Sequence, residues 1–267
     1  MKVLDVCRIM EEIAPLHLAC DWDHVGLMVG DLQAEVTGIL TCLDVTMDVL
    51  EEAVADGRNM IVSHHPFIFH PLTEIDYASP RGRLVAFAVS HGLHIYSAHT
   101  NLDYAERGVN WALAQQLGLQ EVHWDRNHHH LVGKMNCDSM MGLYEKVADR
   151  LMTSLRGIRR YDFCCTGQVN VGISSGAFDG ETQWCIEEDI QVLVTGEVKH
   201  SDAVDLAMMP FMTISAGHFK TERWIAQMLA DEFGSMARFS LRERPVLPEI
   251  YHLEDDECVP CIIKKNN

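Results

Sequence analysis

Two adjacent histidines end a short apolar segment of the chain. His64 and His65 directly follow Met60–Ser63, a segment with the composition of a buried strand. Neighbouring imidazoles repel each other when both are charged, so a histidine pair at the exit of such a strand indicates that an electrophile holds both rings neutral. A metal ion is the simplest candidate, because neutral imidazole is the commonest metal ligand among side chains.

Three further residues extend this candidate metal site. His218 and Glu222 are four positions apart in a segment with a helical pattern, so both side chains project from one face of the helix. Asp103 lies in a loop that follows another expected strand. Such a ligand set suits two borderline divalent ions, without distinguishing Zn, Mn, Fe and Ni. The sequence therefore predicts two divalent metal ions per subunit, held by His64, His65, Asp103, His218 and Glu222.

Two more polar residues stand beyond strand ends, and we predict catalytic or supporting roles for them. Glu197 follows an expected strand and is suited to accept a hydrogen bond from the second ring nitrogen of a metal-bound histidine. His99, in the same loop as Asp103, is suited to move protons because the reference pKa of histidine is near neutral. A buried histidine with a purely structural hydrogen bond is the alternative for His99.

Several other polar residues have simpler explanations. Asp21, Asp23, Asp44 and Asp48 occur where turns and helix caps ordinarily use aspartate, so we leave them out of the predicted site. Residues 128–130 are three consecutive histidines at the start of an expected strand. Their side chains would point to alternating faces of that strand and would chelate a metal poorly as a set.

The cysteines give no sign of a disulfide framework. Nine are present, and several lie in apolar segments, which favours reduced and buried thiols. Cys258 and Cys261 form a single CxxC motif, but no second CxxC supplies the remaining ligands of a tetrahedral zinc site. A stray pair or a weak redox role fits these two residues better.

Composition limits the classes of function. The chain has 267 residues, a formal net charge of -18 and 48% hydrophobic residues. Such acidity argues against nucleic acid as a partner, since a nucleic-acid groove needs clustered Lys and Arg, and the basic cluster at residues 156–160 is typical of an exposed helix end. No apolar stretch approaches the roughly 18 residues of a membrane span. Early acidic residues do not fit a secretory signal, so a cytoplasmic protein is expected.

Strands and helices alternate along most of the chain, which predicts mostly parallel or mixed sheets covered by helices. The apolar patterns predict strands at residues 37–42, 60–63, 94–97, 131–135, 190–194 and 212–215. They predict helices at residues 4–14, 47–55, 81–91, 109–117, 140–155, 200–208 and 219–233, with Thr46 as an N-cap and a loop at residues 172–176.

We expect two α/β domains, at residues 1–126 and 127–267, with the segment 190–235 returning His218 and Glu222 to a shared site. In doubly wound sheets, ligands bind beyond the carboxyl ends of the strands, and the candidate residues follow those ends here. The metal centre is therefore expected in a cleft at the carboxyl ends of strands.

Five segments, in this order, resemble the Nif-three-like family of GTP cyclohydrolase I type 2 homologues: DWDHVGLMVGD, SHHPFIF, AHTNLDYAERGVNWALAQQLGL, TGEVKHSDAV and SAGHFKTE. The resemblance covers most of residues 1–126 and 190–235. It implies a two-domain α/β protein that assembles into a toroidal homohexamer with a dinuclear metal centre facing an internal cavity. It also implies the same five metal ligands, His64, His65, Asp103, His218 and Glu222.

The predicted function is metal-dependent hydrolysis. Two divalent ions lower the pKa of a bridging water, so hydroxide is available at neutral pH to attack an amidine, amide or phosphorus centre. The resemblance implies a small cyclic or nucleotide-like substrate. For a purine nucleotide the attack would fall on the imidazole C8, with His99 or Glu197 as acid and base.

Two alternatives remain open. A metal-binding or regulatory protein without turnover would use the same ligands, and its coordination would tend to be saturated by protein groups. A metal-dependent phosphoesterase would need cations aimed at phosphate, and Lys199 and Lys220 are the only nearby candidates.

Overall fold

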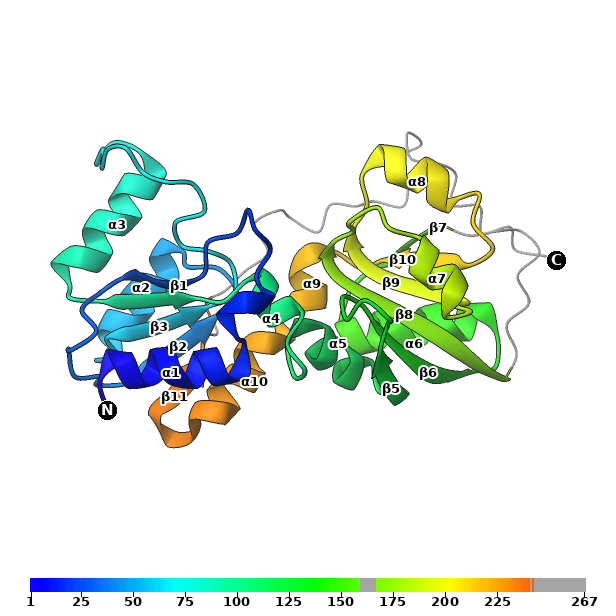
Figure 1. Ribbon diagram of the computed structural model, residues 1–267, viewed down its shortest axis with the longest axis horizontal. Helices are drawn as coiled ribbons and strands as arrows, with labels where there is room; N and C mark the ends of the chain where they lie inside the picture. Colours follow the sequence, from blue (N-terminus) through cyan, green and yellow to red (C-terminus); the bar gives the residue numbers. More distant parts are fainter. Residues whose placement is uncertain (159–166, 241, 243–267) are drawn as a thin grey trace. The chain divides into compact units, whose positions relative to one another are not determined.

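The computed structural model describes residues 1–158, 167–240 and 242, and these residues form two compact units (Figure 1). Among the described residues, the first unit contains Met1–Val109 and takes the chain back at Arg223, and the second contains Asn110–Glu222. Over the described residues, the chain therefore passes between the units twice. One crossing lies in the first turn of helix α5 (Val109–Leu117), and the other is the peptide bond between Glu222 and Arg223.

This division differs from the expected boundary between residues 126 and 127. Helix α5 runs through the first crossing without a break, and the second crossing lies between two helices, α9 (His218–Glu222) and α10 (Trp224–Phe233). Because neither crossing is a polar linker, the pattern of apolar residues continues across both of them. The sequence therefore offered no composition change that would mark either point.

The first unit is built around a five-stranded sheet with the order β1-β4-β3-β2-β11. Strands β4, β3, β2 and β11 are parallel, and β1 is an antiparallel edge strand. The strands are β1 (Gly26–Val29), β2 (Ile39–Cys42), β3 (Met60–Ser63), β4 (His94–Ser97) and β11 (Ala237–Phe239). The helices are α1 (Val3–Ile13), α2 (Met47–Ala55), α3 (Pro80–Ser90), α4 (Thr100–Asp103) and α10, with 3-10 turns η1 (Leu16–Leu18) and η2 (Gly234–Met236).

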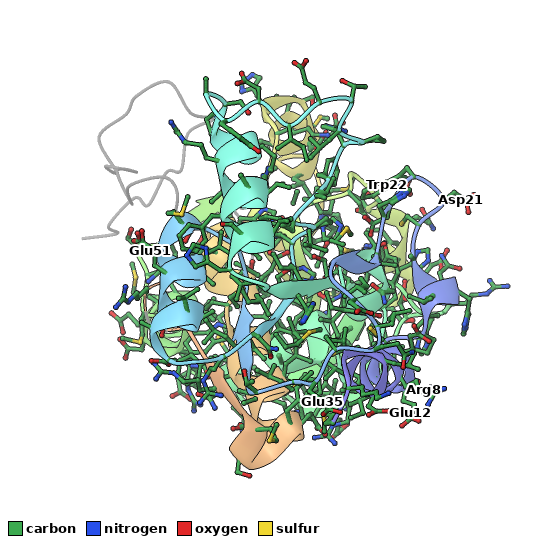
Figure 2. The ribbon with its side chains drawn as sticks, turned by 90° about the vertical axis from the view of Figure 1, so that its left-hand side faces the viewer. Arg8, Glu12, Asp21, Trp22, Glu35 and Glu51 are labelled. Atoms are coloured by element: carbon green, nitrogen blue, oxygen red, sulfur yellow. The ribbon has the colours of Figure 1, made fainter. Side chains whose placement is uncertain are left out.

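Helices α1 and α10 cover one face of this sheet. Thr41 on β2 donates a hydrogen bond of 2.6 Å to the carbonyl of Ala226 on α10. Tyr96, on the same face of β4, is fully buried; burial raises its pKa, and acidic groups of α1 raise it further. Helix α1 turns Arg8 and Glu12 outward to solvent (Figure 2). The polar side of α1 thus faces water while its apolar side closes the core.

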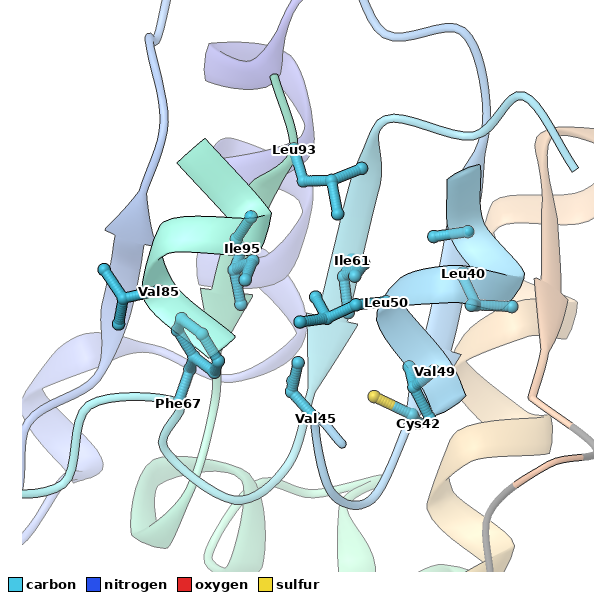
Figure 3. Close-up of a cluster of buried hydrophobic side chains, with 12 residues drawn as sticks. Leu40, Cys42, Val45, Val49, Leu50, Ile61, Phe67, Val85, Leu93 and Ile95 are labelled. Carbon is cyan, nitrogen blue, oxygen red and sulfur yellow. The ribbon is translucent and has the colours of Figure 1, made fainter. Parts of the chain in front are cut away.

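Helices α2 and α3 cover the opposite face. Leu40, Ile61 and Ile95, from three neighbouring strands, pack with Leu50 of α2 and Val85 of α3 (Figure 3). Successive strand residues point to opposite faces, so these three positions alternate with the Thr41 face. Burying each large aliphatic side chain contributes roughly 1.5–3 kcal/mol, which makes the sheet a rigid base for the loops at its carboxyl end.

A buried carboxylate holds β11 in the first unit. Glu52 of α2 is only 3% exposed, and its two oxygens accept hydrogen bonds from Arg238 (2.8 Å) and from the Ser240 hydroxyl (2.6 Å). Arg238 also lies 2.6 Å from Asp56. A buried charge must keep its partners to avoid a large desolvation cost, so the segment that returns from the second unit is an integral part of the first.

The second unit contains a six-stranded sheet with the order β5-β6-β8-β9-β10-β7, in which β8, β9 and β10 are parallel and the other pairs are antiparallel. The strands are β5 (Gln120–Trp124), β6 (Leu131–Cys137), β7 (Arg156–Ile158), β8 (Gly167–Ala177), β9 (Val192–Glu197) and β10 (Met212–Ser215). The helices are α5, α6 (Met140–Leu151), α7 (Gln183–Glu187), α8 (His200–Leu206) and α9. Two mixed sheets with helices confirm the expected α/β fold class.

Most elements occur where the sequence predicts them, and α2, β3, β4, α5 and β10 have the predicted bounds. Thr46 is the N-cap of α2, and its side chain accepts a hydrogen bond from the Val49 N–H. The prediction of a loop at residues 172–176 is wrong, because these residues belong to the long strand β8. Gly172 is there for packing: a Cβ at this position would lie 2.6 Å from the Trp184 ring.

The single helix predicted at residues 219–233 is also wrong. The segment forms α9 and α10, which are separated at Arg223, where the chain returns to the first unit. The sequence also gave no prediction for the strands β1, β5, β7 and β11. These are short or lie at sheet edges, where alternation is too brief to stand out from loop sequence.

The helices of both units are short. The longest among the described residues is α6 with 12 residues, which is about 18 Å long at 1.5 Å per residue. Within the described ranges, no helix combines the length and the apolar character needed to cross a bilayer.

Candidate metal centre

The histidine pair continues strand β3 at its carboxyl end. The His64 N–H donates to the Cys42 carbonyl at 3.1 Å, and the His65 N–H donates to the Leu43 carbonyl at 2.9 Å, so the parallel ladder with β2 extends past the strand. All four residues of β3 are buried. The sheet therefore fixes the backbone of both histidines, and His64 is itself fully buried.

The ring orientation of His64 is set by the neighbouring strand. Its Nδ1 lies 2.9 Å from the carbonyl oxygen of Ala98, just beyond β4. A carbonyl only accepts, so Nδ1 carries the proton and Nε2 presents its lone pair. That Nε2 lies 3.5 Å from Oδ1 of Asp103 at the end of α4. A nitrogen lone pair and a carboxylate oxygen facing each other in a buried place favour a proton or a metal ion near both.

Asp44 orients the second histidine. Its Oδ1 lies 2.8 Å from Nδ1 of His65, and this leaves Nε2 of that ring as the ligand atom. The sequence alone predicts a turn or capping role for Asp44. The signal that would have found it is position: Asp44 follows β2, the direct neighbour of β3, just as His65 follows β3.

Removing Asp44 should weaken metal binding without unfolding the protein. In Asp44→Ala the His65 ring loses the acceptor that fixes its tautomer, so we expect metal affinity to fall roughly 10- to 100-fold. Asp48→Ala is the matched control, because Asp48 is exposed in the first turn of α2. Competition with a chromophoric chelator measures both affinities. Equal affinities in the two variants would contradict the assignment.

Asp23 holds His99 in the same manner. Both Asp23 oxygens lie 3.1 Å from Nδ1 of His99, and Oδ2 also accepts hydrogen bonds from the Thr100 N–H (3.0 Å) and hydroxyl (2.6 Å). Burial acts to raise the pKa of Asp23, but these hydrogen bonds from His99 and Thr100 outweigh it and hold that pKa well below its usual range. The sequence alone predicts neither Asp23 nor Asp44 as a site residue.

The lowered pKa of Asp23 predicts a specific dependence of stability on pH. A carboxyl whose pKa is depressed in the folded state stabilises the protein above its unfolded pKa of about 3.9, and this contribution is lost as pH falls toward the folded pKa. At pH 7, Asp23→Asn should lower the free energy of unfolding by about 2 kcal/mol, the value of charged hydrogen bonds.

Urea unfolding at several pH values tests this expectation. The difference between the wild type and Asp23→Asn should narrow as pH falls below about 4. Asp21→Asn, at the exposed neighbouring aspartate, should stay close to the wild type throughout. If the difference in free energy of unfolding between the wild type and Asp23→Asn stays constant down to pH 3, the pKa of Asp23 is not depressed in the folded state.

Three imidazoles come together in the first unit. The ring centroids of His64, His65 and His99 are 5.0, 5.3 and 5.8 Å apart, and one nitrogen from each ring lies within 4.8 Å of the others. Each Nδ1 faces an oxygen that can only accept, so each Nδ1 carries a proton and Nε2 is the remaining ring nitrogen. This donor set, with carboxylate partners behind two rings, fits a transition metal ion.

The second unit contributes a separate histidine and carboxylate group. Nε2 of His218 lies 2.9 Å from Oε2 of Glu222, one helical turn later on α9, as the four-residue spacing predicts. Nδ1 of His218 lies 3.4 Å from Oε2 of Glu197 at the end of β9. Glu222 is buried and Glu197 is half exposed. One imidazole between two carboxylates is a donor set that a cation would complete.

Two glycines let α9 approach the sheet of the second unit. Gly176 has φ of +64°, and a Cβ there would lie 2.1 Å from Oε1 of Glu222 and 3.4 Å from Nε2 of His218. A Cβ at Gly196 would lie 2.9 Å from the His218 Cα. The Gly176 N–H donates to the Thr221 hydroxyl at 3.1 Å. The ends of β8 and β9 therefore cradle the histidine and carboxylate pair, which sequence reasoning about ligands alone did not reveal.

The consecutive histidines at residues 128–130 have other contacts. His130 is buried, stacks on Trp184 at 4.2 Å, and lies between Asp125 and Asp179 at 3.2 and 3.0 Å. Among the described residues, no group with metal-ligand spacing includes this tract. Cys258, Cys261, Arg159 and Arg160 lie outside the described residues. The prediction of a helix end at this basic cluster is wrong for its first residues, because Arg156–Ile158 form strand β7.

Comparison with known proteins identifies the family. The family model Duf34/NIF3 (NGG1p interacting factor 3) matches residues 1–243. This chain belongs to the Duf34/NIF3 family. A GTP cyclohydrolase 1 type 2 homolog of Clostridium acetobutylicum is 34% identical to this Duf34/NIF3 chain over 232 residues, which are 83% of the chain and 85% of that protein. A protein of the same name from Staphylococcus aureus is 40% identical over 122 residues, 46% of the chain and 33% of the relative.

Solved structures share the fold of this Duf34/NIF3 chain. A crystal structure of a Staphylococcus aureus protein aligns with a TM-score of 0.83 and 22% identity, over 93% of this chain and 99% of that one. A Bacillus cereus protein related to NIF3 aligns with a TM-score of 0.80 and 20% identity, over 93% and 98%. These likenesses show the fold. Together with the family match they confirm the resemblance that the five ordered motifs indicated.

Proposed function

We propose that this Duf34/NIF3 chain is a metal-dependent hydrolase that binds two divalent ions through His64, His65, Asp103, His218 and Glu222. One observation carries the proposal: three neighbouring histidines of the first unit each have Nδ1 against an oxygen acceptor. Neutral imidazoles oriented in this way by an outer ring of acceptors are characteristic of metal sites. A histidine with a merely structural role has no need of two further imidazoles beside it.

The proposed centre combines the ligand groups of both units. Glu222 is the last residue of the second unit and is bonded to Arg223 of the first, and Asp103 stands six residues before the other crossing, at Val109. The family's dinuclear site, to which these residues correspond by resemblance, supports the same combination.

The residues present define the chemistry that such a centre would serve. Two divalent ions, when bound, supply an acidified water and an electrophile for a substrate oxygen. His64 and His65 would hold the ions through Nε2, together with Asp103, His218 and Glu222. His99 has Asp23 behind it to stabilise the ring when it accepts a proton. The exposure of Glu197 suits proton exchange with solvent.

The substrate proposed is a small cyclic or nucleotide-like molecule, as the resemblance implies. A phosphoester is less well supported, because the amine of Lys220 donates to the Met152 carbonyl at 2.8 Å and Lys199 is the N-cap of α8. Lys220 is therefore engaged by a backbone carbonyl, and Lys199 stands at the start of a helix. Neither is a clamp of the kind that phosphoryl transfer uses.

Metal analysis and a formate assay test the proposal together. Protein purified without chelator should contain about two transition metal ions per chain. Incubated with GTP, the metal-loaded protein should release formate, and His64→Ala should not. Absence of stoichiometric metal overturns the proposal. Metal without turnover of GTP, cyclic amides or phosphoesters favours a non-catalytic metal-binding protein. Assembly into a homohexamer stays a prediction, and light scattering measures it.

A further inference from the structure

Two exposed aromatic side chains lie beside the histidines of the first unit. Trp22, between η1 and β1, is 63% exposed, and Phe69, after β3, is 45% exposed. Figure 2 shows Trp22 on a surface loop next to Asp21. The ring centroids of Trp22 and Phe69 lie 6.0 and 6.2 Å from that of His99, and 6.1 Å from each other. The three rings therefore form a nearly equilateral triangle.

The backbone on both sides of Trp22 is fixed to the His99 turn. Asp23 accepts hydrogen bonds from the His99 ring and from Thr100, as described above. The Cys20 N–H donates to the Thr100 hydroxyl at 2.9 Å. Anchors at both neighbours of the Asp21–Trp22 dipeptide fix the backbone around Trp22, and its indole contacts the rings of Phe69 and His99. Leaving so large an apolar ring in water costs hydrophobic free energy, which a ligand that covers it would recover.

The orientation of the rings leaves room for stacking. The interplanar angles are 54° for Trp22 and Phe69, 75° for Trp22 and His99, and 79° for Phe69 and His99. None of these pairs is stacked face to face. With its high exposure, the indole still offers a flat surface to a planar ring, and the phenyl group offers a second one.

The geometry points to a binding site for a planar heteroaromatic ring, stacked on Trp22 and Phe69 with a donor oxygen or nitrogen on its edge directed at the histidine group. The inference rests on the proposed function, because a metal ion there would bind that donor atom. The carboxylate of Asp21, beside Trp22, would repel a polyanionic group on the part of the ligand that lies near Trp22. Two side chains are also too small an area for a stable protein interface, which buries roughly 800 Å² on each partner.

Three hydroxamates test the site, because they share a metal-binding group and differ only in what is attached to it. Acetohydroxamate has no ring, cyclohexanecarbohydroxamate has a puckered ring, and benzohydroxamate has a planar one. Titration calorimetry on the zinc-loaded full chain should show benzohydroxamate binding roughly tenfold tighter than the cyclohexane compound. Trp22→Ala and Phe69→Ala should each lower that preference to about twofold, with acetohydroxamate affinity unchanged. Trp22→Phe, which keeps a planar ring, should restore most of the preference.

Tyr77→Ala is the matched control, since Tyr77 is an exposed aromatic residue in the loop between β3 and α3, which also contains Phe69. It should leave all three affinities unchanged. Equal affinities for the planar and puckered rings in the wild type, or a preference that survives Trp22→Ala, would overturn the aromatic site while leaving the metal centre intact. A wild type that binds no acetohydroxamate would overturn the proposed metal centre and this inference with it. Loss of the preference in Tyr77→Ala as well would point to a broader apolar surface for a protein partner.

Discussion

Replacing His64 by alanine should lower the metal affinity of the protein by two to three orders of magnitude. His64 is fully buried, and its Nδ1 is fixed by the Ala98 carbonyl, so its Nε2 is a prearranged ligand atom. Structural sites with four ligands bind zinc with a free energy of about 10–16 kcal/mol, or roughly 3 kcal/mol for each ligand. Losing one ligand therefore lowers the metal affinity about 100-fold or more. Elemental analysis and chelator competition measure the loss directly.

A second buried histidine of the same sheet provides the control. His94 begins β4, is 8% exposed, and its Nδ1 faces the Asp31 N–H at 3.3 Å. Both His64→Ala and His94→Ala remove a buried imidazole with a backbone hydrogen bond, so each should lower the free energy of unfolding of the metal-free protein by about 1–3 kcal/mol. Only His64→Ala should lose metal. If the two variants retain metal equally, His64 is not a ligand.

Gly176→Ala should disable the ligand group of the second unit while the fold persists. The new methyl group would lie 2.1 Å from Oε1 of Glu222. The end of a glutamate side chain can rotate away, so the clash displaces the proposed ligand and leaves the strand in place. Metal affinity should fall at least roughly tenfold, which is the smallest loss typical of removing a group that orients a metal ligand. The left-handed backbone at φ +64° should cost about 1 kcal/mol in addition.

Gly180→Ala separates the two effects of this substitution. Gly180 lies just after β8, has φ of +91°, and a Cβ there would meet nothing within 4 Å. Gly180→Ala should therefore lower the free energy of unfolding by about 1 kcal/mol because of its positive φ, and the variant should keep its metal. Thermal unfolding and chelator competition on both variants give the comparison. Loss of metal in Gly180→Ala, or full metal retention in Gly176→Ala, would contradict the proposed role of Gly176.

Strands β2, β3 and β4 were predictable because each is a short, fully buried run bounded by turn residues. Strand β3 and helix α2 have their predicted bounds for this reason, and Thr46 marks the helix start by its capping side chain. What the sequence did not reveal depends on contacts between distant residues. Gly172 is typical of a loop in sequence, but in the fold it packs against Trp184. Ala237–Phe239 shows no strand pattern, but it pairs with β2 and is held there by the contact between Glu52 and Arg238.

The candidate site shows the same limit. His64 and His65 are adjacent in sequence, and His218 and Glu222 share a helix face, so their chemistry is visible from spacing alone. Asp44 and Asp23 support His65 and His99 from other strands and loops, and aspartate in a turn has a sufficient local explanation. Only the sheet register, which sets β2 beside β3, distinguishes an orienting carboxylate from a capping one.

The return of the chain to the first unit has a consequence for biosynthesis. On the ribosome, β2 emerges long before β11, the strand that pairs with it, because Asn110–Glu222 of the second unit are translated between them. Until then β2 is an open edge that can pair with other chains. We therefore expect a chain truncated before Ala237 to expose this edge and to aggregate more readily than the full chain.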